Sequence, residues 1–326
     1  MQPRGWQQAW RASVRDPAEL LGLLGLEAEA AAVPRDAMAA FALRVPRGFI
    51  ARMRPGDRDD PLLRQVLPLV DELREVPGFG LDAVGDAAAK AARGVIHKYN
   101  GRALLVATGS CAINCRYCFR RHFPYAEETA AAGGWAEAVA AIAADPGITE
   151  VILSGGDPLS LATRKLHDLT ALLREVPHVR RLRIHSRLPV VLPERVDDEL
   201  LAWLRDLPWP VAMVVHANPA NEFDATVDTA MAALRDAGAS LLNQAVLLAG
   251  VNDSLDALAG LCERGFEAGV LPYYLHQLDR VAGTAHFEVG DDRARALHAA
   301  LVARLPGYLV PRLVREVAGD ASKRPL

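Results

Sequence analysis

The chain has 326 residues, of which 51% are hydrophobic, and a formal net charge of -3 at pH 7. This length and composition allow one large domain with a sizeable core. The charge balance lacks the basic excess that holds nucleic acid by neutralising phosphates, so we expect no nucleic-acid partner. No run approaches the roughly 18 apolar residues of a membrane span, so we expect no membrane partner either.

The first 95 residues carry a helical periodicity that prolines interrupt from Pro34 to Pro77, without a convincing strand. The apolar run at 20–26 is short, contains two glycines and is followed by acidic residues. It therefore predicts a helix and not a secretory signal peptide. We expect an irregular, helical N-terminal region over residues 1–95.

From residue 103 onward, short apolar runs alternate with amphipathic helical stretches. A repeated strand and helix predict a parallel sheet with right-handed crossovers, and so an α/β fold. A doubly wound open sheet would show the same alternation, but no GxGxxG motif follows the first strand. The expected strands are 103–107, 149–153, 181–185, 211–216, 241–248 and 271–276.

Polar residues lie at or near the end of nearly every one of these strands. Active sites of parallel barrels collect at the carboxyl ends of the strands, whereas any single polar residue there could equally cap a helix. Because most strands agree, the pattern favours a barrel or partial barrel whose mouth holds the functional site. The residues are Ser154 to Pro158, His185 to Arg187, His216, Asn218, Asn243, Gln244, His276, Gln277 and Asp279.

Cys111, Cys115 and Cys118 form a close triplet after the first of these strands. Three close cysteines cannot all pair, which argues against a disulfide framework. A 4Fe-4S cluster normally takes four thiolates, so a cluster held by three leaves one iron open to a substrate or cofactor. A zinc site completed by His122 is the alternative. Thiols kept for a metal indicate a reducing compartment, and we expect a cytoplasmic protein.

Cys262 lies far from this triplet, in a segment with helical periodicity. Leu255, Leu258, Ala259, Cys262 and Phe266 share one face of the expected helix. A cysteine in such a stripe behaves as a small apolar side chain. We therefore predict that Cys262 packs in the core and is not a metal ligand.

The CxxxCxxC loop and the glycine-rich turn after the second strand together resemble the radical S-adenosylmethionine superfamily, whose fold is a partial (β/α)6 barrel. The resemblance implies that the three cysteines hold a 4Fe-4S cluster and that an external electron donor reduces it. Glycines let a backbone approach a ligand closely, and Ser154 or Asp157 could accept from the ammonium group of S-adenosylmethionine. The residues implied for this cofactor region are Tyr117, Ser154, Gly155, Gly156 and Asp157.

Longer segments are similar to the lysine 2,3-aminomutases over essentially the whole chain. The match is closest to the bacterial branch that makes (R)-β-lysine for the modification of elongation factor P. Such an enzyme is an isomerase that moves the α-amino group of free L-lysine to the β-carbon by a radical shift. The matching segments are FALRVPRGFIARM (41–53), HKYNGRALL (97–105), CFRRHFPYAEE (118–128), PYYLHQLD (272–279) and GYLVPRLVRE (307–316).

This resemblance implies a further cofactor, pyridoxal 5'-phosphate, held covalently by Lys323 as the catalytic residue. A lysine amine is the expected partner of an aldehyde. The barrel would then occupy 96–305, and 306–326 would be a C-terminal segment that carries the pyridoxal lysine. The resemblance places Lys98, Tyr99 and Arg102 at the cofactor phosphate, and His216 and Gln244 at positions that face a cofactor. We interpret Tyr273 and Tyr274 as barrel packing.

The same resemblance assigns Arg120 to the substrate carboxylate, which a guanidinium can bind in a bidentate mode. Asp279 and Glu316 would hold the distal ammonium group of lysine, which argues against glutamate as substrate. An aminomutase for arginine or glutamate and a non-catalytic iron-sulfur or zinc protein are the alternatives. Pro219 replaces a histidine usual in the HxNHxNE segment, so the contacts of that loop are open.

The expected partners of such an enzyme are its substrate, its electron donor, and, through its product, elongation factor P and the β-lysine ligase that modifies it. These links follow from the branch resemblance alone. A homo-oligomer is compatible with the sequence.

Overall fold

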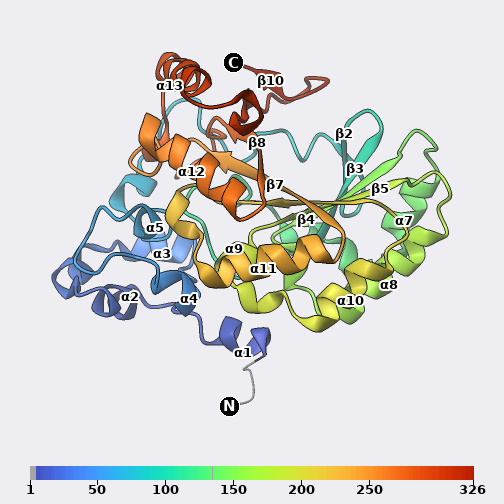
Figure 1. Cartoon of the computed structure of the whole chain (residues 1–326), viewed down its shortest axis with the longest axis horizontal. Coiled ribbons are helices and arrows are strands. Elements are labelled where there is room, and N and C mark those ends of the chain that lie inside the picture. Colours follow the sequence, from blue (N-terminus) through green and yellow to red (C-terminus); the bar gives the residue numbers. More distant parts are fainter. Residues whose placement is uncertain (1–4, 134) are drawn as a thin grey trace.

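One ten-stranded sheet runs through the chain. Its strands are β1 Lys90–Ala92, β2 Val95–Tyr99, β3 Arg102–Thr108, β4 Glu150–Gly155, β5 Arg181–Ser186, β6 Val211–Val215, β7 Ala239–Val246, β8 Leu271–His276, β9 Arg312–Arg315 and β10 Arg324–Pro325. Their order in space is their order in the sequence (Figure 1). The computed structural model describes residues 5–133 and 135–326.

The strands from β3 to β9 pair in parallel, whereas β1, β2 and β10 make antiparallel pairs at the two ends of the sheet. Each of the six expected strands is present, within two residues of its expected bounds, as β3 to β8. The α/β fold and the partial barrel are therefore confirmed. β9 adds a seventh parallel strand that the sequence did not reveal, because it is only four residues long.

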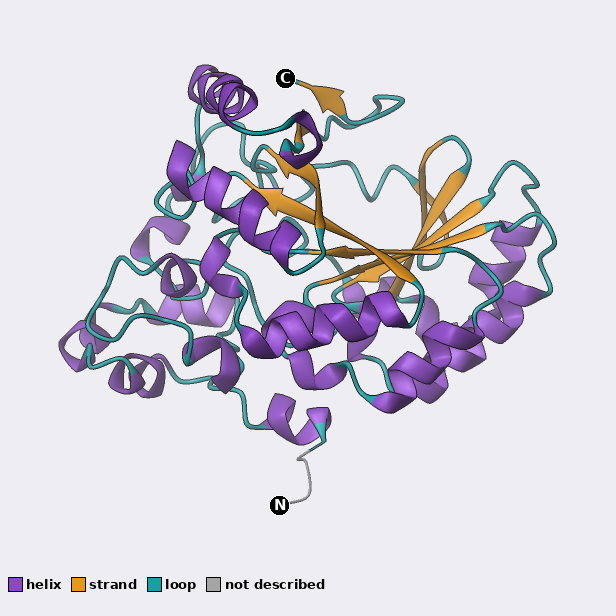
Figure 2. Ribbon diagram, in the orientation of Figure 1, coloured by secondary structure: helices purple, strands orange, loops and turns teal. Residues whose placement is uncertain are grey.

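Helices follow the strands and cover the outer face of the sheet (Figure 2). They are α6 Tyr125–Glu128, α7 Ala136–Ala143, α8 Thr163–Arg174, α9 Leu188–Val191, α10 Asp198–Asp206, α11 Ala225–Asp236, α12 Leu255–Glu267 and α13 Asp291–Arg304. Short 3-10 turns lie at Ala130–Gly133, Pro158–Ser160, Pro193–Arg195, Ala220–Glu222, Ala285–Phe287 and Gly307–Leu309. Asp197, Asp224 and Ser254 cap α10, α11 and α12 by accepting from first-turn N–H groups.

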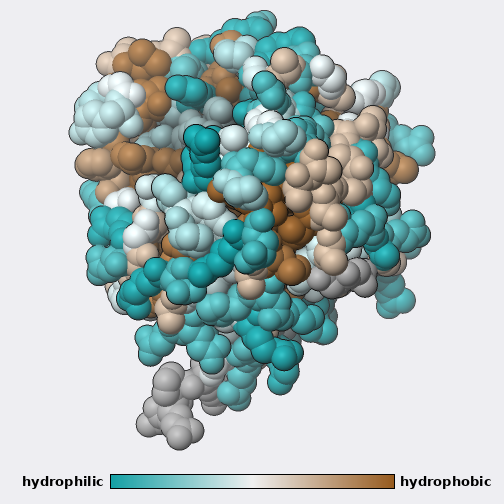
Figure 3. Space-filling view, turned by 90° about the vertical axis from the view of Figure 1, so that its right-hand side faces the viewer, coloured by the Kyte–Doolittle hydropathy of each residue, from teal (hydrophilic) through white to brown (hydrophobic). Residues whose placement is uncertain are grey.

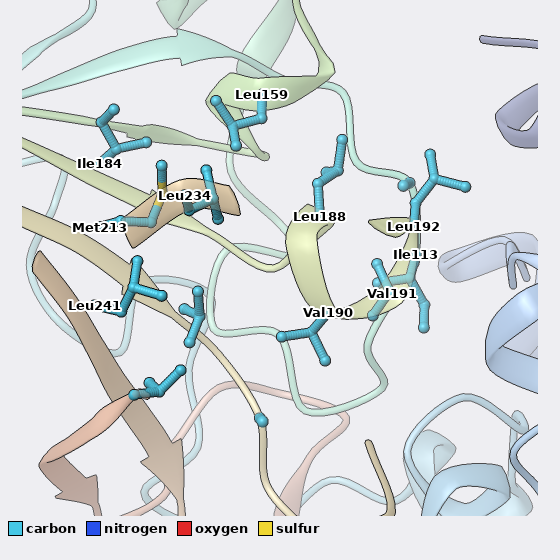
Figure 4. Packing of buried hydrophobic residues seen from close by; sticks show 14 of the residues in the cluster. Ile113, Leu159, Ile184, Leu188, Val190, Val191, Leu192, Met213, Leu234 and Leu241 are labelled. Atoms are coloured by element: carbon cyan, nitrogen blue, oxygen red, sulfur yellow. The ribbon is translucent and has the colours of Figure 1, made fainter. Parts of the chain in front are cut away.

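Side chains alternate along the strands between the helices and the interior of the barrel. Ile184, Met213 and Leu241, on β5, β6 and β7, are buried, and Figure 4 shows them in a row beside Leu234 of α11. His185, the next residue on β5, instead lines the inner cavity. The outward residues thus build the core, and the inward ones are left for the site.

The N-terminal region consists of short helices joined by long connections, at the lower left of Figure 1. The helices are α1 Trp6–Arg11, α2 Pro17–Leu23, α3 Arg35–Ala40, α4 Arg47–Ile50 and α5 Pro61–Arg64, with 3-10 turns at Glu27–Ala32 and Val70–Leu73. The expectation that residues 1–95 hold no strand is wrong, because β1 and the start of β2 lie there. β1 is three residues long without an apolar alternation, so its pairing with β2 and not its own sequence defines it.

Cys262 lies in α12 with 4% of its surface exposed, which confirms that it packs in the core. Phe266 does not share its buried face. This phenylalanine is 44% exposed, and its ring centroid lies 5.5 Å from that of Tyr308 on the surface. Hydrophilic residues cover most of the molecular face in Figure 3. Among the described helices, none has the length and apolar character needed to cross a membrane.

Candidate active site

A cavity of about 870 Å³ occupies the interior and mouth of the barrel. Ligand pockets are typically about 300–1,000 Å³, so this one could hold a cofactor and a small substrate together. Every residue that the family resemblance implied for the cluster, the cofactors and the substrate lines it, from the three cysteines to Lys323, whereas Pro158, Ser186, Asn218, Asn243 and Gln277 of the strand ends do not. The cavity therefore brings together residues from both ends of the chain.

Cys111, Cys115 and Cys118 lie on the loop after β3 and line one wall of the cavity. Burial raises the pKa of Cys111, and the nearby charges of Asp157 and the other two thiols raise it further. Burial and then Cys115 raise the pKa of Cys118 to about 11. The thiols of Cys111 and Cys118 are therefore costly to ionise unless a cation joins them. Their chemistry therefore fits a bound metal cluster.

The zinc alternative gains no support from His122. Its Nε2 lies 3.1 Å from the carbonyl oxygen of Ala282, and His122 does not line the cavity that the three cysteines line. Within residues 5–133 and 135–326, no three His, Cys, Asp or Glu side chains take the spacing of a single bound ion.

The N-terminal region holds the cysteine loop in place. Arg44 donates from Nη1 to the carbonyl oxygen of Cys111 at 2.9 Å. Arg116, inside the loop, is fully buried and donates from Nε to Oε1 of Glu72 at 2.8 Å. Ile113 is buried close to α9 (Figure 4). The helical region thus serves as a support for the loop that the cysteines occupy.

The turn after β4 needs its glycines because it lies flush against the end of β3. A Cβ atom on Gly155, whose φ is +118°, would come within 2.4 Å of the carbonyl oxygen of Thr108. One on Gly156 would come within 2.6 Å of the carbonyl oxygen of Ser110. The turn is therefore fixed beside the cysteine loop by backbone contact.

Asp157 is committed to holding this turn. Its carboxylate accepts from Ser186 Oγ at 2.8 Å and from the backbone N–H groups of Leu159, Arg187 and Leu188 at 3.0, 2.7 and 3.1 Å. Four bonds fill its acceptor sites, although burial still raises its pKa to about 6. The structure thus gives Asp157 an anchoring role, and the expectation that it accepts from a ligand ammonium is not met.

Tyr117 belongs to a buried polar network that the sequence did not reveal. Its hydroxyl accepts from Asn218 Nδ2 at 2.7 Å and from Arg187. Arg187 Nη2 donates to Glu222 Oε1 at 2.9 Å and to Gln65 Oε1 at 2.8 Å, and its Nη1 also contacts Cys115 Sγ. Asn218 and Glu222, which lie on either side of Pro219, therefore both make inward contacts. Gln65 comes from the N-terminal region, where no sequence pattern pointed to it.

Arg120 and Lys98 are joined by a carboxylate that the sequence did not suggest. Arg120 donates from Nε to Asp86 Oδ2 at 2.7 Å and from Nη1 to Ser154 Oγ at 3.2 Å. Lys98 Nζ lies 2.6 Å from Asp86 Oδ1, 2.9 Å from Glu316 Oε1 and 2.8 Å from the carbonyl oxygen of Val84. These three acceptors use all the protons of Lys98, so it would bind a phosphate only after releasing one of them.

Lys323 lies at the far side of this network. Its Nζ donates to Glu316 Oε2 at 2.7 Å and stands 5.7 Å from the centre of the Tyr274 ring. Although burial opposes it, Lys323 and Lys98 lower the pKa of Glu316 to about 2. The antiparallel pair of β10 with β9 holds the tail at this position. Tyr274 therefore faces the cavity beside Lys323, in addition to packing against Tyr273.

Asp279 stands apart from the ion pairs. Burial, followed by the negative charge of Glu316, raises its pKa to about 7. Its Oδ1 is buried and has no hydrogen-bond partner among the described residues. A buried carboxyl without a partner is unfavourable, so this atom is suited to a cationic ligand.

Several neutral polar groups of the cavity likewise have buried atoms without a partner among the described residues. They are Nε2 of His185, His216 and His276, Oε1 of Gln244 and the hydroxyl of Tyr99. Burial lowers the pKa of His216 to about 4, with Arg187 and Lys323 adding to the shift, so its ring is neutral at neutral pH. Unpaired buried polar atoms are rare in proteins. Their concentration here indicates that the cavity is built around a polar ligand.

Arg102 is a cation of the cavity that is left to bind an anion. Its guanidinium lies 4.7 Å from the centre of the Tyr99 ring. Within the described part of the chain it makes no ion pair, whereas Lys98 and Arg120 are both paired. Of the three residues expected at a phosphate, Arg102 and Tyr99 thus have groups to offer.

The chain matches known proteins over most of its length. The model of the Radical SAM superfamily matches residues 105–267. The L-lysine 2,3-aminomutase of Escherichia coli is 50% identical over 96% of this chain and 92% of its own length. The enzyme of the same name from Haemophilus influenzae is 42% identical over 98% of this chain and 95% of its own length. The L-lysine 2,3-aminomutase of Clostridium subterminale is 34% identical over 85% of this chain and 67% of its own length.

A solved structure, a radical SAM methyltransferase from Sphaerobacter thermophilus, superposes on 68% of this chain and 68% of its own with a TM-score of 0.46 and 16% identity.

Proposed function

Because the chain belongs to the lysine 2,3-aminomutase family of the radical S-adenosylmethionine superfamily, we propose that it converts L-α-lysine into (R)-β-lysine. The observation that carries the proposal is the charge pattern of one cavity. Arg120, Asp279, Glu316 and Lys323 all line this cavity together with the three cysteines. A lysine molecule has the matching groups, a carboxylate at one end and an ammonium at the other.

The residues of the cavity fit the cofactors that the family implies. The cysteine loop would hold a 4Fe-4S cluster, the Gly155-Gly156 turn would face S-adenosylmethionine, and Lys323 would hold pyridoxal 5'-phosphate. When bound, these groups supply a carbon radical and a conjugated ring that can accept it. The unpaired atoms of His216 and Gln244 support a polar ligand beside the turn.

The chain's own residues orient the substrate. Arg120 has one guanidinium edge open to a carboxylate. Asp279 takes the distal ammonium, whose positive charge favours its ionised form. Glu316 is occupied by Lys98 and Lys323. Glu316 would serve as the second acid where the distal ammonium of the substrate replaces one of these two partners.

The role of the product and the setting of the enzyme follow from the branch to which the chain is similar. We propose that (R)-β-lysine is made for the modification of elongation factor P, in the cytoplasm, with an external donor supplying the electron. The assignment is supported by the 50% identity to the Escherichia coli enzyme.

The test uses protein purified and reconstituted without oxygen, then supplied with S-adenosylmethionine, pyridoxal phosphate, a strong reductant and L-lysine. We expect β-lysine, identified against chiral standards, and no product from the Cys115→Ser or Lys323→Ala variants. Arginine and glutamate serve as competing substrates. Turnover of either in place of lysine would reject the substrate assignment, and wild-type protein that never cleaves S-adenosylmethionine would reject the activity.

A further inference from the structure

We propose that Asp86 is a positioning residue that orients Arg120 toward the carboxylate of the amino-acid substrate, an inference that rests on the proposed function. Asp86 comes from the connection that precedes β1, outside the barrel. Its carboxylate nevertheless lines the cavity, and only 4% of the residue is exposed. It binds Arg120 through Oδ2 and Lys98 through Oδ1.

The contact with Asp86 decides which edge of Arg120 faces the cavity. Asp86 takes the inner nitrogen, Nε, and Ser154 Oγ accepts from Nη1. Phe119 lies under the guanidinium, with 4.8 Å between Cζ and the ring centre. Nη2 has no hydrogen-bond partner in the described part of the chain, so the outer edge is left for a ligand. A guanidinium held in this way can bind a carboxylate without losing further freedom.

The backbone at Asp86 is itself held in place. Asp82 accepts from the N–H groups of Asp86 and Ala87 at 2.9 and 3.0 Å. The same segment is joined to the loop after β8, where Gly80 N donates to the carbonyl oxygen of Arg280 at 3.0 Å. A fixed acceptor imposes its direction on Arg120, which a mobile surface acid could not do. This arrangement is typical of groups that orient a binding residue.

A purely structural role for Asp86 would have a different signature. If the ion pair of Asp86 only stabilises the fold, its loss would weaken the binding of every ligand of the cavity to a similar extent. If Asp86 orients Arg120, its loss would weaken the binding only of ligands that carry the carboxylate. Lysine and 1,5-diaminopentane differ by that group alone, so their comparison separates the two roles.

The experiment uses full-length protein loaded with pyridoxal phosphate, without S-adenosylmethionine or reductant. Each amine is titrated while the visible absorbance of the bound cofactor is followed. We expect Asp86→Asn to lower the affinity for lysine roughly tenfold or more relative to the wild type. Its affinity for 1,5-diaminopentane should stay within about twofold of the wild-type value. Asp86→Glu should recover part of the lysine affinity. Glu128→Gln, which removes the exposed ion pair of Lys90 nearby, is the matched control and should change neither.

An equal loss of affinity for both amines, or no loss of affinity for lysine, would overturn the role of Asp86 while leaving the proposed function intact. Failure of the wild-type protein to bind lysine would overturn the proposed function itself. If Asp86→Asn does not fold, Asp86→Glu gives the same comparison, because its longer side chain misplaces the acceptor and should again affect lysine more than 1,5-diaminopentane.

Discussion

We expect Asp279 to destabilise the cofactor-free protein at neutral pH, so that its replacement by asparagine raises the free energy of unfolding. Burial raises the pKa of this carboxyl from 3.8 to about 7. Its folded-state pKa thus exceeds the value of about 3.9 in an unfolded chain. Between these values the folded protein binds more protons than the unfolded chain, so stability falls as the pH rises, and the full cost is reached above pH 7.

The size of the effect follows from the shift. Each pH unit between the two pKa values lowers the free energy of unfolding by about 1.4 kcal/mol. The total loss therefore approaches about 4 kcal/mol above pH 7. Asp279→Asn lacks the titrating group. The variant should therefore gain stability over the wild type by about 1.4 kcal/mol per pH unit between about pH 4 and pH 7, and by nothing further above it.

The assay is urea unfolding of both proteins at several pH values from about 5 to 8, without cofactors. Glu316→Gln is the control of opposite sign, because Lys323 and Lys98 lower the pKa of Glu316 to about 2 despite its burial. That variant should be less stable than the wild type over this whole range. A stability gap between Asp279→Asn and the wild type that does not change with pH would refute the reasoning.

Three further variants, two substitutions and one truncation, test other contacts. Gly156→Ala should cost several kcal/mol in urea unfolding, roughly 3 or more, because the new Cβ would meet the carbonyl oxygen of Ser110 at 2.6 Å; an unchanged midpoint would contradict this. Glu72→Gln should cost about 3–5 kcal/mol, since it leaves Arg116 and a second buried arginine without their acid; a smaller loss than for an exposed acid would reject it. Removal of residues 324–326 should release the tail from β9 and abolish covalent binding of pyridoxal phosphate, as measured by absorbance after borohydride reduction, while unfolding stays nearly unchanged.

The six central strands could be predicted because short runs with apolar residues alternate with helical stretches along the chain. The short strands could not. β1 and β10 have no apolar pattern of their own, and they exist because a neighbouring strand offers unpaired backbone groups. Phe266 was misplaced for a related reason, since helical periodicity predicts a face but not where the neighbouring elements end.

The composition of the site was predictable, but the pairing within it was not. The cysteine spacing and the family segments led to residues that all line one cavity. Asp86 lies in an alanine-rich stretch that gives no sign of function. Once it is in place, Lys98 has its three protons taken by oxygens of the chain. Such competition among charges depends on distances that no one-dimensional pattern contains.

The order of the sheet has a consequence for how the protein is made. Because neighbouring strands in the sheet are successive in the sequence, each new strand can dock on the one before it as the chain leaves the ribosome. The cysteine loop would then be in place long before Lys323 is translated. A nascent chain that has already built its barrel would still lack the amine on which the proposed chemistry depends, so the protein would gain its reactive centre only after the barrel is complete.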